Sequence, residues 1–176
     1  MPCLPSRKTL GARAEIIADA ERVAHAIVRR SEEELARERT RQRILFRQQM
    51  VKTAIDTFGK LDTLVCNAGN LRDRMLVNMT EEDWDSVIHV HLKGHFCPLR
   101  HAAAYWRDRS KAGENVAGRV VFTTSGSGLF GNIAQANYVS AKAAIAILGR
   151  SAAAELKRYD VTVNVIGPVA RTRMND

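Results

Sequence analysis

The sequence predicts an α/β fold in which a parallel sheet of about three strands is flanked by helices on both faces, with an added N-terminal helical segment. Three short segments rich in apolar and β-branched residues, 61–66, 118–125 and 161–166, are the expected strands. Long helix-favouring stretches separate these segments. Strands joined by such crossovers pair in parallel, and this is the basis for the predicted fold class.

The first expected element is helical. Residues 12–58 contain neither glycine nor proline and are rich in Ala, Arg, Glu, Ile and Leu, a composition that favours helix. Ser31 precedes three glutamates, which is typical of a helix N-terminus. The segment is therefore expected to form either two helices or one long bent helix. We expect residues 1–47 to be an arginine-rich helical segment and residues 48–176 to be a separate α/β domain.

The helices between the strands follow from local signals. Thr80 and Asp83 form a capping box for a helix that extends to about residue 107. A second helix, over about 134–159, follows a loop that contains glycine. Gly167 and Pro168 end the last strand, because proline cannot continue a hydrogen-bonded ladder.

Composition and charge restrict the class of protein. The chain has 176 residues, 45% of them hydrophobic, and a formal net charge of +8, which suits one soluble domain. No apolar run approaches the roughly 18 residues that a membrane span needs. The three cysteines have no paired spacing. We therefore expect a cytoplasmic protein with reduced thiols and no membrane partner.

Nucleic acid and metal are weaker alternatives. The positive charge permits attraction to nucleic acid, so a basic binding module formed by residues 1–47 is conceivable. The sequence has no zinc-finger spacing and no aromatic RNA-binding motif, and we expect no nucleic-acid partner. His91 and His95 are one helical turn apart, but no cysteine or carboxylate completes a zinc site at a recognisable spacing, so we expect no metal.

Tyr138 and Lys142 are candidate catalytic residues because of their spacing. Four positions are one helical turn, so both side chains are expected on the same helix face. A cation beside a phenol favours the phenolate, and such a tyrosine can exchange a proton with an alcohol or an alkoxide. The spacing alone also fits a surface pair, as at Tyr105 and Arg109. Ser125 favours the catalytic interpretation, because it ends an expected strand and ligands bind outside the carboxyl ends of parallel strands.

Several sequence blocks occur in a recognisable order along the last three quarters of the chain. They are LDTLVCNAG (61–69), HVHLKGHF (89–96), VVFTTSGSGLFGN (120–132), QANYVSAKAA (135–144) and VTVNVIGPVARTRM (161–174). With these blocks the chain resembles the short-chain dehydrogenase/reductase family from about residue 48 to residue 176. Within that family, the residues of these blocks are most similar to members of the (3R)-hydroxyacyl-CoA dehydrogenase type. The resemblance implies a Rossmann-like sheet.

The resemblance also implies a reaction and the roles of its residues. The reaction is hydride transfer between NAD or NADP and a secondary alcohol or ketone, with a 3-hydroxyacyl thioester as the narrower expectation. Tyr138 is then the catalytic acid or base, Lys142 favours its ionised form and binds the nicotinamide ribose, and Ser125 polarises the reacting oxygen. His91 occupies the position of the family's catalytic Asn, where an imidazole can hold a water for proton relay.

Further implied residues contact the cofactor or a second subunit. Asn67, Ala68 and Gly69 are expected to line the adenosine side of the cofactor cleft, although the same three residues also suit an ordinary turn. Pro168 and, after it, Thr172 fall where the family approaches the nicotinamide carboxamide. In the family, helices equivalent to 82–107 and 134–158 form a four-helix interface, which implies a homo-oligomer.

One family motif is missing from this sequence. Family members begin with a strand and a glycine-rich turn, T-G-x-x-x-G-x-G, that places the cofactor pyrophosphate on a helix N-terminus. Here Gly11 is the only glycine before Gly59. We therefore expect a truncated version of the fold. The alternative to an active oxidoreductase is an inactive fragment that cannot bind dinucleotide and acts at most through helix-mediated oligomerisation.

Overall fold

The computed structural model describes residues 7–169, with part of the side chains of the first helix left undescribed. The chain divides into two compact units, Met1–Leu45 and Phe46–Asp176, which are considered separately. Within the described residues, no helix is both long enough and apolar enough to cross a membrane.

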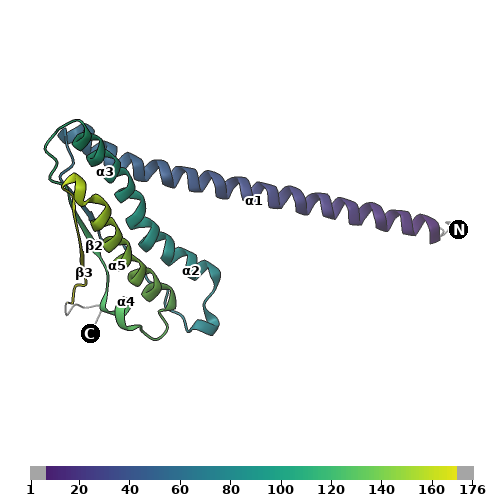
Figure 1. Ribbon diagram of the computed structural model, residues 1–176. Coiled ribbons are helices and arrows are strands. Elements are labelled where there is room, and N and C mark those ends of the chain that lie inside the picture. Colours follow the sequence, from purple (N-terminus) through teal and green to yellow (C-terminus); the bar gives the residue numbers. More distant parts are fainter. Residues whose placement is uncertain (1–6, 170–176) are drawn as a thin grey trace. The chain divides into compact units, whose positions relative to one another are not determined.

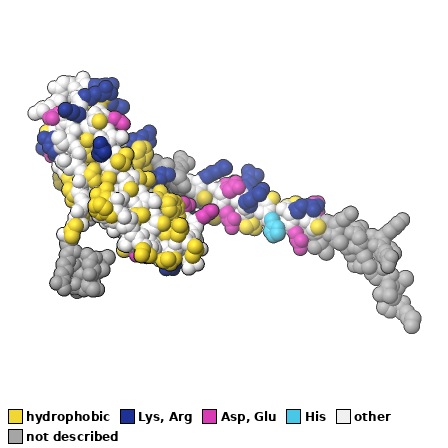
Figure 2. Space-filling view, turned by 60° about the horizontal axis from the view of Figure 1, so that its bottom comes forward, with side chains coloured by type: hydrophobic (Ala, Val, Ile, Leu, Met, Phe, Trp, Pro, Cys, Tyr) yellow, Lys and Arg dark blue, Asp and Glu magenta, His cyan; other side chains and the backbone are white. Residues whose placement is uncertain are grey.

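The N-terminal part of the chain is a single α-helix. Helix α1 extends over Arg7–Phe58, so of the two expected arrangements the structure has one helix, and Ser31 lies in its interior rather than at a helix start. The absence of glycine and proline from 12–58 explains this continuity. Ion pairs at helical spacing, such as Arg30 with Glu34 at 3.2 Å, add support along the helix. Figure 2 shows side chains of both charges along its described part.

The sheet has three parallel strands, as predicted. Strand β1 covers Thr63–Cys66, β2 covers Arg119–Thr123 and β3 covers Thr162–Ile166, each within the segment expected from the sequence. The order in the sheet is β1-β2-β3. In the register, Val65 lies opposite Val121, and Val121 lies opposite Asn164. The predicted α/β class is thereby confirmed.

Helices connect the strands. After the short helical turn Leu76–Asn78, helix α2 (Glu81–Ile88) continues through a π-helical turn (His89–Lys93) into α3 (Gly94–Lys111). Between β2 and β3 lie the short helix α4 (Gly126–Phe130), helix α5 (Ala136–Leu156) and the turn Lys157–Tyr159. The capping box begins α2 as expected, because the Thr80 hydroxyl accepts a hydrogen bond from the Asp83 amide at 3.1 Å.

Both long crossover helices cover the same face of the sheet. Figure 1 shows α3 and α5 on the same side of the strands. The expectation of helices on both faces is therefore not met by the described part of this unit, where Val65 and Ile166 on the opposite face are 61% and 48% exposed. The reason is topological. Two successive parallel crossovers that advance across the sheet in one direction, each right-handed, place their helices on one side.

A hydrophobic core fills the space between these helices and the sheet. Trp106 of α3, Phe122 of β2 and Ile145 of α5 are its largest fully buried side chains of the apolar type. The indole nitrogen of Trp106 donates to the Leu61 carbonyl at 2.7 Å, which ties α3 to the segment that leads into β1. Gly149 permits close packing of α5 on β3, since an added Cβ would lie 2.2 Å from a methyl group of Val165.

Candidate active site

The π-helical turn between α2 and α3 brings His91 into the interior. His91 is 2% exposed, and its Nε2 lies 2.8 Å from the Asn70 carbonyl oxygen and 3.1 Å from the Asn70 amide nitrogen. It donates to the oxygen or accepts from the amide according to its tautomer. Burial is the main factor that lowers the pKa of His91, and the nearby Lys142 charge lowers it further. The imidazole is therefore neutral at pH 7.

Tyr138, in the first turn of α5, contacts both His91 and Lys142. The rings of His91 and Tyr138 meet edge to face, with centroids 5.2 Å apart and an interplanar angle of 88°. The Nζ of Lys142 lies 5.6 Å from the centroid of the Tyr138 ring. The expected placement of Tyr138 and Lys142 on one helix face is thus observed, and His91 joins them from another helix.

Lys142 is held deep in the structure. Its side chain is 4% exposed, and its ammonium donates a hydrogen bond to the carbonyl of Thr123 at 2.7 Å, at the end of β2. Burial lowers the pKa of this lysine from its ordinary value. The Lys142 carbonyl in turn accepts from the Thr124 hydroxyl at 2.7 Å. These two bonds attach α5 to the carboxyl end of the central strand.

Ser125 lies near the same end of β2, but it belongs to the start of the next helix and not to the strand. Strand β2 ends at Thr123, and Ser125 is the N-cap of α4, with its hydroxyl accepting from the Ser127 amide at 3.3 Å. Helix α4 packs against α5, where Gly128 approaches Lys142 so closely that an added Cβ would lie 2.6 Å from the Cβ of the lysine. Ser125 is half-buried. The described contacts place it beside the Lys142 anchor and do not join it to Tyr138.

The segment that follows β1 is more exposed than the residues around Lys142. Asn67, Ala68 and Gly69 are exposed, as a surface that receives a ligand must be. Gly69 also lies against the His91 ring, because a Cβ added there would be 2.6 Å from Cε1 of the histidine. Pro168 is exposed beyond β3, and Thr172 lies outside the described residues.

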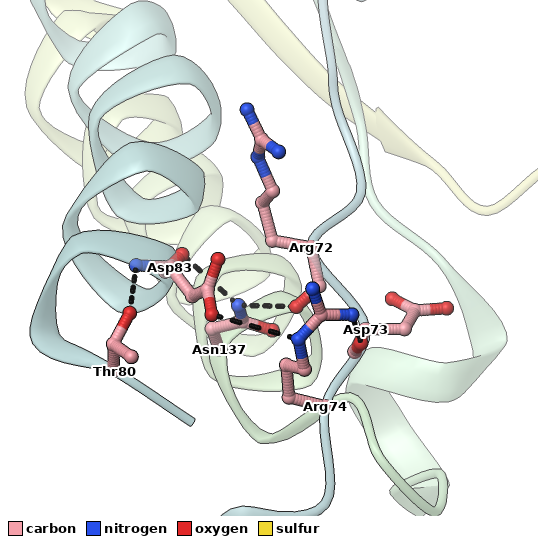
Figure 3. A network of polar contacts seen from close by, with 6 residues as sticks. All are labelled: Arg72, Asp73, Arg74, Thr80, Asp83 and Asn137. Atoms are coloured by element: carbon pink, nitrogen blue, oxygen red, sulfur yellow. Dashed lines mark hydrogen bonds and ion pairs between the residues drawn. The ribbon is translucent and has the colours of Figure 1, made fainter. Parts of the chain in front are cut away.

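Asn137 and Asn70 were not identified from the sequence. Asn137 is fully buried and its side-chain amide joins α5 to the segment after β1 and to α2 (Figure 3). Asn70 holds His91 by its backbone and Ser86 by its side chain, at 3.2 Å. Apart from the bond between Asn137 and the adjacent Tyr138 amide, their hydrogen-bond partners lie 16 to 65 positions away in sequence, so no local pattern identified them. The position of Asn137 directly before Tyr138 was the only available signal.

The described side chains around Tyr138 are groups that form hydrogen bonds and exchange protons. No cluster of three or more His, Cys, Asp or Glu suited to a metal occurs among them. His95, which is 1% exposed, pairs its Nδ1 with the His91 carbonyl at 2.6 Å. A phenol, an ammonium and a strand-end hydroxyl at one sheet edge can instead bind hydroxyl or carbonyl oxygen and exchange a proton with it.

The chain was compared with known proteins. Residues 12–176 match the family model described as short chain dehydrogenase. The hydroxyacyl-CoA dehydrogenase ChsB1 of Mycobacterium tuberculosis is 58% identical over 118 residues, which are 66% of this chain and 37% of that protein. The peroxisomal multifunctional enzyme type 2 of Mus musculus is 43% identical over 129 residues, or 73% of this chain and 17% of that protein.

Solved structures agree with the sequence matches. A short chain dehydrogenase from Mycobacterium avium superimposes with a TM-score of 0.71 at 58% identity, covering 73% of this chain and 44% of that one. The chain thus spans less than half the length of these relatives. The shared sheet confirms the expected Rossmann-like α/β fold. By the extent of the family match and by this fold, the chain belongs to the short-chain dehydrogenase family.

Proposed function

We propose that this chain acts as an oxidoreductase that transfers hydride between NAD or NADP and a secondary alcohol or ketone. The observation that carries the proposal is the contact of Tyr138 with Lys142 and His91, where the lysine ammonium lies 5.6 Å from the phenol ring centroid. The buried Lys142 ammonium can stabilise negative charge that develops on the phenol oxygen during proton transfer. Such a pair at the carboxyl end of a parallel sheet suits proton exchange with a bound alcohol.

Each residue would have a separate task. The Tyr138 oxygen takes the hydroxyl proton when an alcohol is oxidised and returns it when a ketone is reduced. Lys142 stabilises the charge on that oxygen, and the Thr123 carbonyl holds the lysine in place at 2.7 Å. The Ser125 hydroxyl donates to the substrate oxygen. When bound, the nicotinamide supplies the hydride acceptor or donor.

His91 would supply a polar group behind the tyrosine. Its Nδ1 is buried and has no hydrogen-bond partner among the described residues, whereas Nε2 contacts Asn70. A buried ring nitrogen of this kind is suited to hold a water molecule. A neutral imidazole can both accept and donate, so His91 can take part in moving a proton away from Tyr138.

The residues fit two separate parts of a dinucleotide. An ammonium has three N–H donors, so Lys142 can serve a ribose hydroxyl in addition to the Thr123 carbonyl. The exposed segment Asn67 to Gly69 follows the neighbouring strand at the same sheet edge and suits the adenosine side. In the described stretch upstream of β1, residues 12–58 hold no glycine that could form a pyrophosphate-binding turn. The fit therefore covers the adenosine side and the nicotinamide ribose, but not the pyrophosphate that joins them.

The relatives indicate a substrate class. One is named a hydroxyacyl-CoA dehydrogenase, and a second, 42% identical over 120 residues, is named a 3-oxoacyl-[acyl-carrier-protein] reductase. Both names describe an acyl thioester that carries a hydroxyl or keto group. We therefore favour a 3-hydroxyacyl or 3-oxoacyl thioester as the substrate of this chain.

A second copy of the chain is the proposed partner. A groove of about 550 Å³ lies between α3 and α5 on the side away from the sheet, with Phe96, Leu148 and Tyr159 among its lining residues. Phe96 is 46% exposed, an unusual position for phenylalanine. Packing of this groove against its copy would bury it. Light scattering of the purified chain is expected to give the mass of a dimer, and a monomer mass would contradict this part of the proposal.

The reaction is tested with the purified chain. NADH and NADPH are titrated separately by nicotinamide fluorescence, and oxidation of a 3-hydroxyacyl-CoA is then followed. Tyr138→Phe is expected to lower kcat by about 100-fold or more, because general acid–base catalysis contributes about 10²–10⁴. Tyr105→Phe is the matched control, since Tyr105 also has a basic partner four residues on, with Arg109 donating to its hydroxyl at 3.1 Å. It should retain full activity.

Two results would contradict the proposal. Turnover that survives Tyr138→Phe would exclude the assigned role of the phenol. Absence of NADH and NADPH binding at millimolar concentrations would favour the alternative of an inactive fragment that acts at most through oligomerisation.

A further inference from the structure

Asn137, the residue directly before Tyr138, has an unusually complete set of hydrogen bonds. Its side chain is 0% exposed, and every polar atom of its amide group is used. Oδ1 accepts from the backbone amide of Tyr138 at 2.7 Å, and Nδ2 donates to the carbonyls of Arg72 and Asp83 at 3.0 and 3.1 Å. Figure 3 shows the amide between these two carbonyls.

The acceptor half of the amide stabilises the start of α5. The first four N–H groups of an α-helix have no partner within the helix, and an N-cap side chain usually accepts from one of them. The N-cap residue of α5, Gln135, makes no such bond. Asn137 provides one instead, from inside the first turn, to the amide of the residue that carries the catalytic phenol.

The donor half connects that turn to two distant segments. Arg72 belongs to the segment after β1, and Asp83 lies in the first turn of α2, where the Thr80 hydroxyl caps its amide. A further hydrogen bond links the segment after β1 to the residues that precede α5: the Arg74 amide donates to the Ala134 carbonyl at 2.8 Å. Ala134 has a φ of 64°, in the left-handed region that L-residues avoid, so the surrounding contacts hold this backbone in place.

The ring and the backbone of Tyr138 are therefore held by different residues. His91 and Lys142 contact the ring, whereas Asn137 fixes the backbone from which the ring projects. A rotation of this first helical turn would move the phenol oxygen while leaving the rest of α5 in place. Catalytic groups lose efficiency when misplaced by as little as about 1 Å.

We propose that Asn137 is a positioning residue for Tyr138, with its amide setting the location of the phenol oxygen relative to Lys142 and to the substrate. This inference rests on the proposed function. An amide is required chemically, because the site demands one acceptor and two donors in one short side chain, which among the natural side chains of this size only asparagine offers. Alanine removes all three bonds, and serine retains a single hydroxyl that cannot reach both carbonyls.

The test uses two readouts on the full chain. The three tyrosines are labelled as 3-fluorotyrosine, and the fluorine resonance of Tyr138 is assigned with Tyr138→Phe. In Asn137→Ala the Tyr138 resonance is expected to shift or broaden, while those of Tyr105 and Tyr159 stay unchanged. In parallel, kcat is expected to fall about 10- to 100-fold at a nearly constant KM, since proton transfer is impaired and substrate binding is not.

Thr80→Ala is the matched control. It removes a hydrogen bond of the same network and is expected to lower the melting temperature, whereas none of the three bonds of Asn137 involves the Thr80 side chain. We expect an unchanged Tyr138 resonance and unchanged kcat in this variant. If Asn137→Ala does not fold, Asn137→Ser is measured instead, with the same expected signature.

The outcomes separate this inference from the proposed function. A wild-type chain without turnover would contradict the proposed function, while the fluorine spectrum would still report whether Asn137 sets the position of Tyr138. A folded Asn137 variant with an unchanged Tyr138 resonance would overturn the inference. The same would follow if Thr80→Ala displaced Tyr138 and lowered kcat to the same extent, because the effect would then be one of general stability.

Discussion

The N-terminal helical unit and the α/β unit use similar residues in opposite ways. In the first, Ile27 and Leu35 are 64% and 55% exposed, whereas in the second Ile145 and Phe122 are fully buried. Charged side chains show the same contrast, with the side chain of Arg30 82% exposed in an ion pair and Lys142 only 4% exposed. A helix can form from propensity and spacing alone, but a site requires groups that several elements hold away from water.

The contrast explains why the candidate site found among the described residues lies in the α/β unit. A charge in water is screened and mobile, whereas a desolvated charge acts strongly on its neighbours. Lys142 is anchored by the end of β2 and faces Tyr138, which His91 supports from another helix. The exposed ion pair of Arg30 with Glu34 stabilises a helix and does little else.

The largest effect is expected from Trp106→Ala in the α/β unit. This side chain is 2% exposed in the core, and its loss also leaves the part-buried Leu61 carbonyl without the indole donor. We expect the free energy of unfolding to fall by about 3–5 kcal/mol. Urea unfolding followed by circular dichroism measures it. A loss below about 1 kcal/mol would show that the core between α3 and the sheet is not formed as described.

An intermediate effect is expected on acidification. Burial lowers the pKa values of His91 and His95 below their ordinary value of 6.5, so the unfolded chain binds protons that the folded chain does not. The free energy of unfolding should therefore fall as pH decreases from 6.5 through the lowered pKa values. Each such proton contributes up to about 1.4 kcal/mol per pH unit.

Unfolding titrations between pH 5 and 7 measure this dependence. His95→Gln removes one titrating group. It should reduce the slope of the unfolding free energy against pH by up to about 1.4 kcal/mol per pH unit, which corresponds to one proton. An unaltered slope in His95→Gln would show that His95 is accessible to protons in the folded state.

The smallest effect is expected from Ile27→Ala in the N-terminal unit. The side chain is 64% exposed, so its truncation loses little apolar burial. Alanine is also a better helix former than isoleucine, and this gain nearly cancels the lost burial. The change in unfolding free energy should stay within about 0.5 kcal/mol. The measurement is again urea unfolding. A loss above about 1 kcal/mol would show that this face of α1 is buried against another surface in solution. It would contradict the statement that apolar side chains of the N-terminal unit are exposed.

Much of the fold could be predicted from short sequence patterns. The three strands lie within the predicted segments because β-branched runs such as the one around Val120 bury well in a parallel sheet. The Thr80 cap was also predictable, since its bond to Asp83 spans only three residues. The sequence left two possibilities open at Ser31, because the capping signal there favours a helix start whereas the absence of glycine and proline favours one long helix. The structure has the single helix.

The candidate site was predictable to a smaller extent. The pairing of Tyr138 with Lys142 follows from one helical turn, and both were identified for that reason. The π-helical turn that buries His91 has no known sequence signal in this chain, and the bonds of Asn137 join residues 54 and 65 positions apart. Ser125 was assigned to a strand end, whereas its hydroxyl caps α4.

The sequence by itself determined the strands, the helices between them and the presence of Tyr138 and Lys142 on one helix face, because these features depend on residues within a few positions of one another. The tertiary structure alone decided which face of the sheet the helices cover, how Lys142 reaches the Thr123 carbonyl, and that one buried amide, that of Asn137, supports Tyr138. Those features depend on bonds between distant segments, and such bonds form only when packing has removed the competing water.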